Sequence, residues 1–170
     1  MDGEKRPYTY EEGLGEFYRG EIVGEAIYSG LVECAKDPLE RLKLAHLLQL
    51  ETETKAWLRP HMIAAGVSVA EPAASRDPAI GFVNRLGALS WSEKVQFIAD
   101  IVPGQVTQYR AYADAARARG NAAQAAVCDF MVEHELAQAE FARHELAGAE
   151  PAVSLAPLLR HSCNPLPTCV

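Results

Sequence analysis

The sequence predicts an all-α protein, an up-down four-helix bundle built from two repeated helical hairpins joined by a long crossover. Four stretches, at about residues 12–35, 38–64, 90–118 and 121–148, are dominated by Ala, Leu, Glu, Gln and Arg, which favour helix. No segment shows the alternation of β-branched and polar residues that is typical of a strand. The second pair of stretches also repeats the first at a shift of 84 residues.

The second and fourth helices have clear start signals. Asp37 is followed by Pro38 at the first helical position and by Glu40 at N3, where a capping box places its acidic residue. Gly120 and Asn121 combine a helix stop with a new N-cap. Because only a few residues separate the helices within each pair, each pair is expected to form an antiparallel hairpin.

The segment from about residue 65 to 89 is predicted to be the long crossover between the hairpins. It contains a short helical pattern near Ala79–Leu86 among five helix-breaking residues. These are Gly66, Pro72, Pro78, Gly81 and Gly87. We expect one domain over about residues 1–150, followed by an irregular Pro-rich tail over about 151–170.

Composition limits the partners of the chain. With 16 basic and 23 acidic residues the net charge is −7, which disfavours nucleic acid and anionic lipid surfaces. No apolar run approaches the roughly 18 residues of a membrane span, and the polar N-terminal residues do not resemble a signal peptide. We therefore expect a cytoplasmic protein without a membrane span, and base rates for helical bundles favour a homodimer.

The four cysteines lack the close spacing of a zinc or thioredoxin-type site. Cys34 and Cys128 fall in helical patterns and are expected to be small buried residues with reduced thiols. Cys163 and Cys169 flank the Pro-rich tail near His161, where a metal or redox site is the less favoured alternative.

The repeat aligns polar residues of the two hairpins. Glu21 and Glu51 are 30 residues apart, as are Gln105 and Glu135, so each pair is expected at one height across its hairpin. The aligned pairs are Gly20 with Gly104, Glu21 with Gln105, Tyr28 with Tyr112, Glu51 with Glu135, and Trp57 with Phe141. Gln105 lies near the middle of an apolar helix face, and Glu21 and Glu51 have apolar neighbours along their helices. Buried acids are normally paired, protonated or bound to a metal, so a cluster at one level of a bundle indicates a metal site.

The run Gly20-Glu21-Ile22-Val23-Gly24, followed by Ile27-Tyr28, resembles the first metal helix of the ferritin-like carboxylate-bridged di-metal superfamily, in particular of rubrerythrin-like proteins and demethoxyubiquinone hydroxylases. The resemblance implies a ferritin-like bundle descended from metal-dependent oxidoreductases of the hydroxylase or peroxidase type. It implies as metal ligands Glu21, Glu51 and Glu135, with Gln105 in place of a fourth Glu and with Thr54 and Gln138 in place of two histidines.

This ligand set is incomplete for di-iron, because only three of the six expected ligand types are present. It predicts either loss of the metals or a weakly bound ion such as Fe, Mn, Mg or Ca. The alternative to an enzyme is a metal-free helical scaffold, or a bundle that binds a small apolar ligand and acts through self-association.

Several residues near these positions allow two interpretations. Glu51 could form an exposed i,i+4 pair with Lys55 instead of pointing inward. His134 could supply a missing imidazole or be an ordinary core residue. Tyr28 and Tyr112 could hydrogen-bond the acidic cluster or simply fill the core. The pair Glu140 and His144 is expected on a solvated face.

Overall fold

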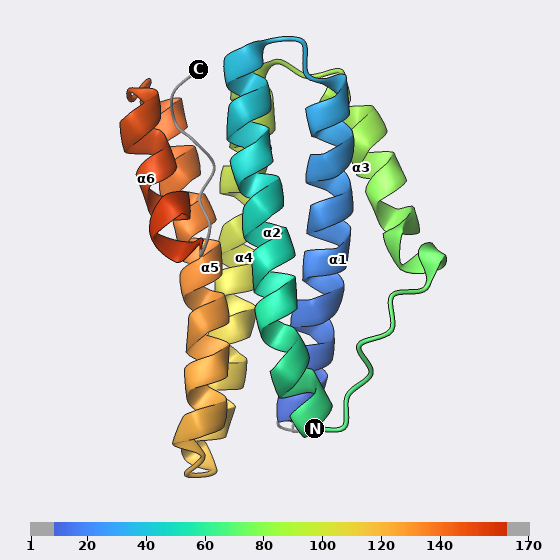
Figure 1. Cartoon of the computed structure of the whole chain (residues 1–170). Coiled ribbons are helices and arrows are strands. Elements are labelled where there is room, and N and C mark those ends of the chain that lie inside the picture. Colours follow the sequence, from blue (N-terminus) through green and yellow to red (C-terminus); the bar gives the residue numbers. More distant parts are fainter. Residues whose placement is uncertain (1–8, 163–170) are drawn as a thin grey trace, which may run out of the picture.

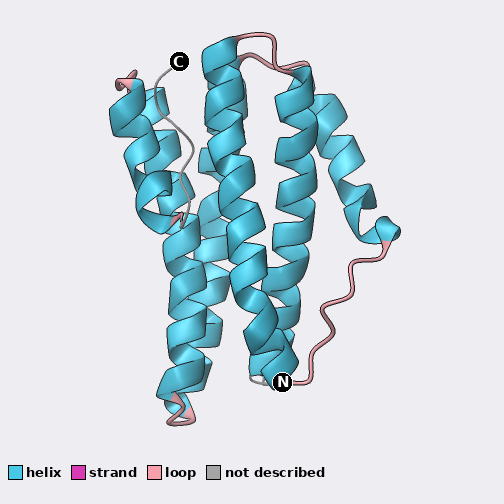
Figure 2. Cartoon of the chain, in the orientation of Figure 1, coloured by secondary structure: helices cyan, strands magenta, loops and turns pink. Residues whose placement is uncertain are grey.

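The computed structural model describes residues 9–162, and within this range the regular structure is entirely helical (Figures 1 and 2). The all-α prediction is therefore confirmed. The elements are α1 (Tyr10–Cys34), α2 (Pro38–Ala64), the 3-10 helix η1 (Ala73–Arg76), α3 (Asp77–Gly87), α4 (Trp91–Ala118), α5 (Ala122–Leu146) and α6 (Pro151–His161).

The helix starts follow the local sequence. Asp37 accepts a hydrogen bond from the Glu40 backbone N at 2.8 Å, and Pro38 opens α2, as predicted. Asn121 caps α5 in the same way through Gln124 N. Gly120 between α4 and α5 has φ +71°, a left-handed conformation in which a Cβ would be strained.

The four long helices lie side by side, with α1 packed on α2 and α4 packed on α5 (Figure 1). The shorter α3 lies against α1, and α6 lies against α5 and α2. The 84-residue offset also relates the ends of α1 and α4, Cys34 and Ala118, and the starts of α2 and α5, Pro38 and Ala122.

The core lies between these helices. Phe17 is fully buried and meets Tyr109 and Tyr112 edge-on, with ring centroids 4.6 and 5.6 Å apart. The largest fully buried side chains are Tyr112, Phe17, Phe141, Leu14, Ile22, Leu44, Leu47, Leu50, Leu58, Met62, Met131 and Leu155. None of the helices in the described range combines the length and the apolar character that crossing a bilayer requires.

The crossover is held to the long helices by Glu71. Its carboxylate accepts hydrogen bonds from Tyr18 Oη at 2.7 Å, Lys55 Nζ at 3.0 Å and Arg59 Nη2 at 2.8 Å. Burial opposes ionisation of Glu71, but these hydrogen bonds outweigh it and lower its pKa to about 2. The loop runs from the end of α2 alongside α1 and leads into α3, which packs against α1 (Figure 1).

The prediction of an irregular tail is wrong for residues 151–161, which form α6. Leu155 and Leu158 are buried, so this segment contributes to the core although it contains Pro157. Pro157 has no N–H for the carbonyl of Val153 one turn earlier, and that carbonyl accepts a hydrogen bond from His144 Nδ1 at 3.1 Å instead. A tertiary contact thus compensates the proline inside the helix.

The cysteine predictions have mixed outcomes. Cys128 is buried, as expected, and burial raises its pKa to about 11. Cys34 is exposed, contrary to expectation; because Leu31 and Ala35 on either side of it are buried, Cys34 lies on the outward face of the end of α1. Cys163 and Cys169 lie outside the described residues.

Candidate metal centre

A buried acidic cluster forms where α1, α2 and α5 face one another. Glu21 comes from α1, Glu51 from α2, and His134 from α5, and each is at most 4% exposed. His134 Nε2 lies 3.6 Å from Glu21 Oε1 and 3.5 Å from Glu51 Oε1. One ligand atom from each of the three residues lies within 4.8 Å of the others, so the cluster could bind a metal ion.

His134 also contacts the two residues that stand at the predicted histidine positions. Its Nδ1 lies 3.0 Å from Thr54 Oγ1, and its Nε2 lies 2.9 Å from Gln138 Nε2. One imidazole therefore lies between the two positions where the resemblance expects two. The interpretation of His134 as a cluster member fits the structure better than that of an isolated core residue.

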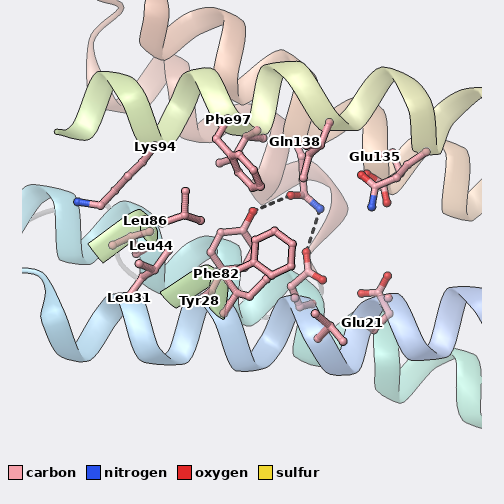
Figure 3. A pocket seen from close by; sticks show the side chains of 18 of the residues that line it. Glu21, Tyr28, Leu31, Leu44, Phe82, Leu86, Lys94, Phe97, Glu135 and Gln138 are labelled. Carbon is pink, nitrogen blue, oxygen red and sulfur yellow. Dashed lines mark hydrogen bonds between the residues drawn. The ribbon is translucent and has the colours of Figure 1, made fainter. Parts of the chain in front are cut away.

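Gln138 links the cluster to a tyrosine. Its amide donates to Glu51 Oε1 at 2.9 Å, and its carbonyl oxygen accepts from Tyr28 Oη at 3.0 Å (Figure 3). Tyr28 thus hydrogen-bonds the cluster indirectly, whereas Tyr112, the residue that the sequence alignment paired with it, is buried beside Phe17. This chain of donors fixes the orientation of the Glu51 carboxylate.

Two carboxylate oxygens of the cluster are buried without a hydrogen-bond partner within the described part of the chain. They are Glu21 Oε2 and Glu135 Oε2. Glu135 follows His134 on α5, is 3% exposed and faces Glu21 across a cavity (Figure 3). Unpaired buried acceptors are costly, and a bound cation or a proton would satisfy them.

The electrostatics of the cluster favour positive charge. Burial raises the pKa of Glu21 well above its usual value. His134 opposes this shift, whereas the carboxylates of Glu51 and Glu135 add to it. Burial likewise raises the pKa of Glu135 to about 7. Burial opposes the charging of His134, but the carboxylates of Glu21 and Glu51 outweigh it and raise its pKa to about 10. At neutral pH the cluster therefore holds protons that a cation would displace.

The interpretation of Glu51 as half of an exposed pair with Lys55 is wrong. Glu51 is 4% exposed, and Lys55 instead pairs with Glu25 and with Glu71, the latter at 3.0 Å. The inward position of Glu51 is made possible by Gly24 on α1, because a Cβ there would lie 2.2 Å from Glu51 Oε2. The sequence placed Gly24 inside the quoted motif but did not reveal this role, which depends on how α1 and α2 face each other.

Gln105 does not join the group of ligand atoms. It is half-buried on α4 and lines the cavity that Glu21 and Glu135 also line. Of the seven residues predicted at the metal site, six therefore contribute to the hydrogen-bonded cluster or its carboxylate wall, while Gln105 lies on the cavity wall. The six are Glu21, Glu51, Thr54, His134, Glu135 and Gln138.

The cavity has a volume of about 200 Å³ and extends from the carboxylates along α1 and α4 (Figure 3). Its far part is lined by apolar side chains, including Phe82 and Leu86 of α3. Sequence reasoning anticipated a short helix here but not its role as a wall of the site. The amphipathic pattern of Phe82 and Leu86, four residues apart, was the available signal.

The pair Glu140 and His144 lies outside this centre. Glu140 accepts from Arg160 Nη2 at 2.9 Å and lies 4.0 Å from His144 Nε2, at the contact of α5 with α6. His144 is engaged with the Val153 carbonyl, so the pair serves the attachment of α6.

No family model, curated protein or solved structure matches this chain. Function is therefore inferred from the side chains of the cluster and the cavity beside it.

Proposed function

We propose that the protein is a ferritin-like four-helix bundle, derived from a duplicated helical hairpin, that holds one divalent cation. We propose further that it oxidises a small molecule beside that cation, with dioxygen or a peroxide as the oxidant that is reduced. The reaction class is that of a metal-dependent oxidoreductase of the hydroxylase or peroxidase type. The duplication is supported by the 84-residue offset, which relates helix ends and starts as well as the residues of the motif. The metal centre is supported by the buried Glu-Glu-His cluster.

One observation carries the proposal: ligand atoms of Glu21, Glu51 and His134, from three helices, lie within 4.8 Å of one another in the core. Glu135 adds a nearby oxygen without a hydrogen-bond partner in the described residues. Carboxylate oxygens and one imidazole suit Fe²⁺ or Mn²⁺. Mg²⁺ and Ca²⁺ are harder cations and would bind through the carboxylates alone.

The donor set fits one cation and not two. Three carboxylates and one imidazole fall short of the four carboxylates and two imidazoles that hold a pair of metal ions in di-metal bundles. Thr54 and Gln138, at the positions of two further ligands, are engaged with His134. Two of the three departures from the di-metal pattern, at Thr54 and Gln138, therefore lie beside that imidazole, and the third is Gln105 on the cavity wall.

A bound cation would supply Lewis acidity or a redox couple at the carboxylate end of the cavity. The chain's own residues provide the rest. Tyr28 and Gln138 orient the Glu51 carboxylate, and the apolar walls from α3 and α4 exclude water from a molecule held there. Glu135, with a pKa of about 7, can hold or release a proton at neutral pH.

The test is metal content after expression in medium supplemented with iron and manganese, combined with titration of the chelated protein with Fe²⁺, Mn²⁺, Mg²⁺ and Ca²⁺. We expect about one equivalent of one of these ions in the native protein and its loss in Glu21→Gln. The matched control is Glu33→Gln, an exposed glutamate on the same helix, which should retain the ion. Less than about a tenth of an equivalent in the native protein overturns the proposal.

A second candidate function is a metal-free scaffold. It is favoured by the hydrogen bond between Thr54 and His134 and by those that Gln138 makes with Glu51 and Tyr28, which satisfy these groups without an ion. The same titration discriminates between the two, because the scaffold binds none of the four ions. Its buried protonated carboxyl would also keep its infrared band when those ions are added.

A further inference from the structure

We infer that the cavity beside the acidic cluster binds a neutral molecule about the size of a substituted benzene that carries one hydroxyl or carbonyl group, and that Gln105 and Tyr109 hold that group. This inference deepens the proposed function by naming a class of substrate, and it rests on that function only for the reaction, not for the binding.

The size and lining of the cavity set the body of the ligand. A cavity of roughly 150 Å³ lined by aliphatic and aromatic side chains can hold benzene, and this one measures about 200 Å³. Apolar side chains from three helices, including Ile27, Leu86 and Ile98, make up much of the wall. A compact hydrocarbon body with one or two substituents therefore fits.

Two polar groups on one wall remain available for a ligand. Gln105 and Tyr109 are one turn apart on α4 and both line the cavity. Neither side chain makes a hydrogen bond to another residue within the range 9–162. Gly20 opposite Tyr109 keeps the space open, because a Cβ there would lie 3.3 Å from Tyr109 Oη. A hydroxyl or carbonyl oxygen placed here would accept from, or donate to, both groups.

Charge in the cavity excludes anions. Lys94 is the one cationic side chain among the described lining residues, and its Nζ donates to Glu40 Oε1 at 2.7 Å and to the Leu89 carbonyl at 2.9 Å. The opposite end carries the carboxylates of Glu21 and Glu135. A carboxylate ligand would face these acids without a free cation to pair with, so a neutral ligand is favoured.

The binding test uses calorimetric titration of the chelated, metal-free full chain with toluene, p-cresol, 4-methylbenzoate and benzylamine at neutral pH. We expect p-cresol to bind about 25-fold more tightly than toluene, since it adds two hydrogen bonds, one with Gln105 and one with Tyr109, each worth about fivefold. We expect no detectable binding of 4-methylbenzoate. We expect weaker binding of benzylamine than of p-cresol, because Glu21 already faces His134 Nε2 at 3.6 Å and the ammonium group would lose its hydration in an apolar cavity. Equal affinity for toluene and p-cresol, or tighter binding of either charged probe, overturns the inference.

Variants test whether Gln105 and Tyr109 bind the polar group of the ligand. Gln105→Leu should lower the affinity for p-cresol about fivefold and leave toluene unchanged, and Tyr109→Phe should act in the same direction. The matched control is Gln108→Leu, an exposed glutamine on the same helix, which should change neither affinity. Identical behaviour of Gln105→Leu and Gln108→Leu contradicts the assignment.

The location is tested by Val23→Phe, which adds a ring to a half-buried residue of the cavity wall and should abolish binding of both toluene and p-cresol. Circular dichroism tests whether this variant is folded. Unchanged affinities in a folded variant would show that the ligand binds elsewhere. If Val23→Phe does not fold, the comparison of Gln105→Leu with Gln108→Leu tests whether the ligand binds in this cavity. Because all titrations use metal-free protein, p-cresol binding without any metal uptake would refute the proposed function and leave this inference standing.

Discussion

Replacing Gly24 by alanine tests whether the close approach of α1 to Glu51 holds the acidic cluster together. The added Cβ would lie 2.2 Å from Glu51 Oε2 and 2.7 Å from Glu51 Cδ, both far below ordinary van der Waals contact. The carboxylate must therefore move, and its 2.9 Å hydrogen bond from Gln138 Nε2 breaks or distorts.

The expected energy change has two parts. Losing a hydrogen bond to a buried charged group costs about 1.5–3 kcal/mol. Alanine in place of glycine within a helix returns about 0.5–1 kcal/mol. Gly24→Ala should therefore lower the free energy of unfolding by about 1–2 kcal/mol and weaken cation binding at least tenfold, a change of about 1.4 kcal/mol in binding free energy.

The matched control is Gly15→Ala on the same helix. A Cβ at Gly15 would meet nothing within 4 Å, so this variant should be about 0.5–1 kcal/mol more stable than the native protein and bind the cation normally. Urea unfolding and titration with Mn²⁺ measure both quantities for both variants. If Gly24→Ala behaves as Gly15→Ala does in the two assays, the reasoning about Glu51 is refuted.

Three further predictions concern protons, the crossover and the tyrosine. Cation binding at neutral pH should release about two protons, because burial raises the pKa of Glu21 and the neighbouring carboxylates raise that of His134 to about 10. The affinity for the cation should therefore increase with pH. Calorimetry in two buffers of different ionisation enthalpy counts the protons, and a pH-independent affinity contradicts this expectation. Glu71→Gln should lower the free energy of unfolding by about 1–2 kcal/mol above pH 4.5. The difference between native protein and variant should vanish as the pH falls towards 2, since the pKa of Glu71 in the folded protein is lowered to about 2. Urea unfolding at several pH values measures this difference, and a constant difference would mean that Glu71 is not ionised in its hydrogen bonds. Tyr28→Phe removes the donor to Gln138 Oε1 and should cost about 1–2 kcal/mol of unfolding free energy, whereas native-like stability in thermal melts would mean that water replaces the hydroxyl.

Local sequence determined the long helices and their starts. The Asp37-Pro38 signal and the Gly120-Asn121 signal act through neighbouring backbone groups, so they could be interpreted without tertiary information. Helical periodicity and the 84-residue offset placed Glu21 and Glu51 inward for the same reason: both depend on spacing along the chain.

Only the tertiary structure decided what lies between the helices. Thr54, Gln138 and His134 come from different turns of α2 and α5, and their mutual distances depend on how these helices are rotated against each other, which periodicity leaves open by a residue or more. The helix over 151–161 was not predicted because it depends on tertiary contacts: the burial of Leu155 and the hydrogen bond from His144 on α5 to the Val153 carbonyl. Helix propensity predicts that Pro157 destabilises the helix, whereas the packing that offsets this destabilisation exists only in the folded chain.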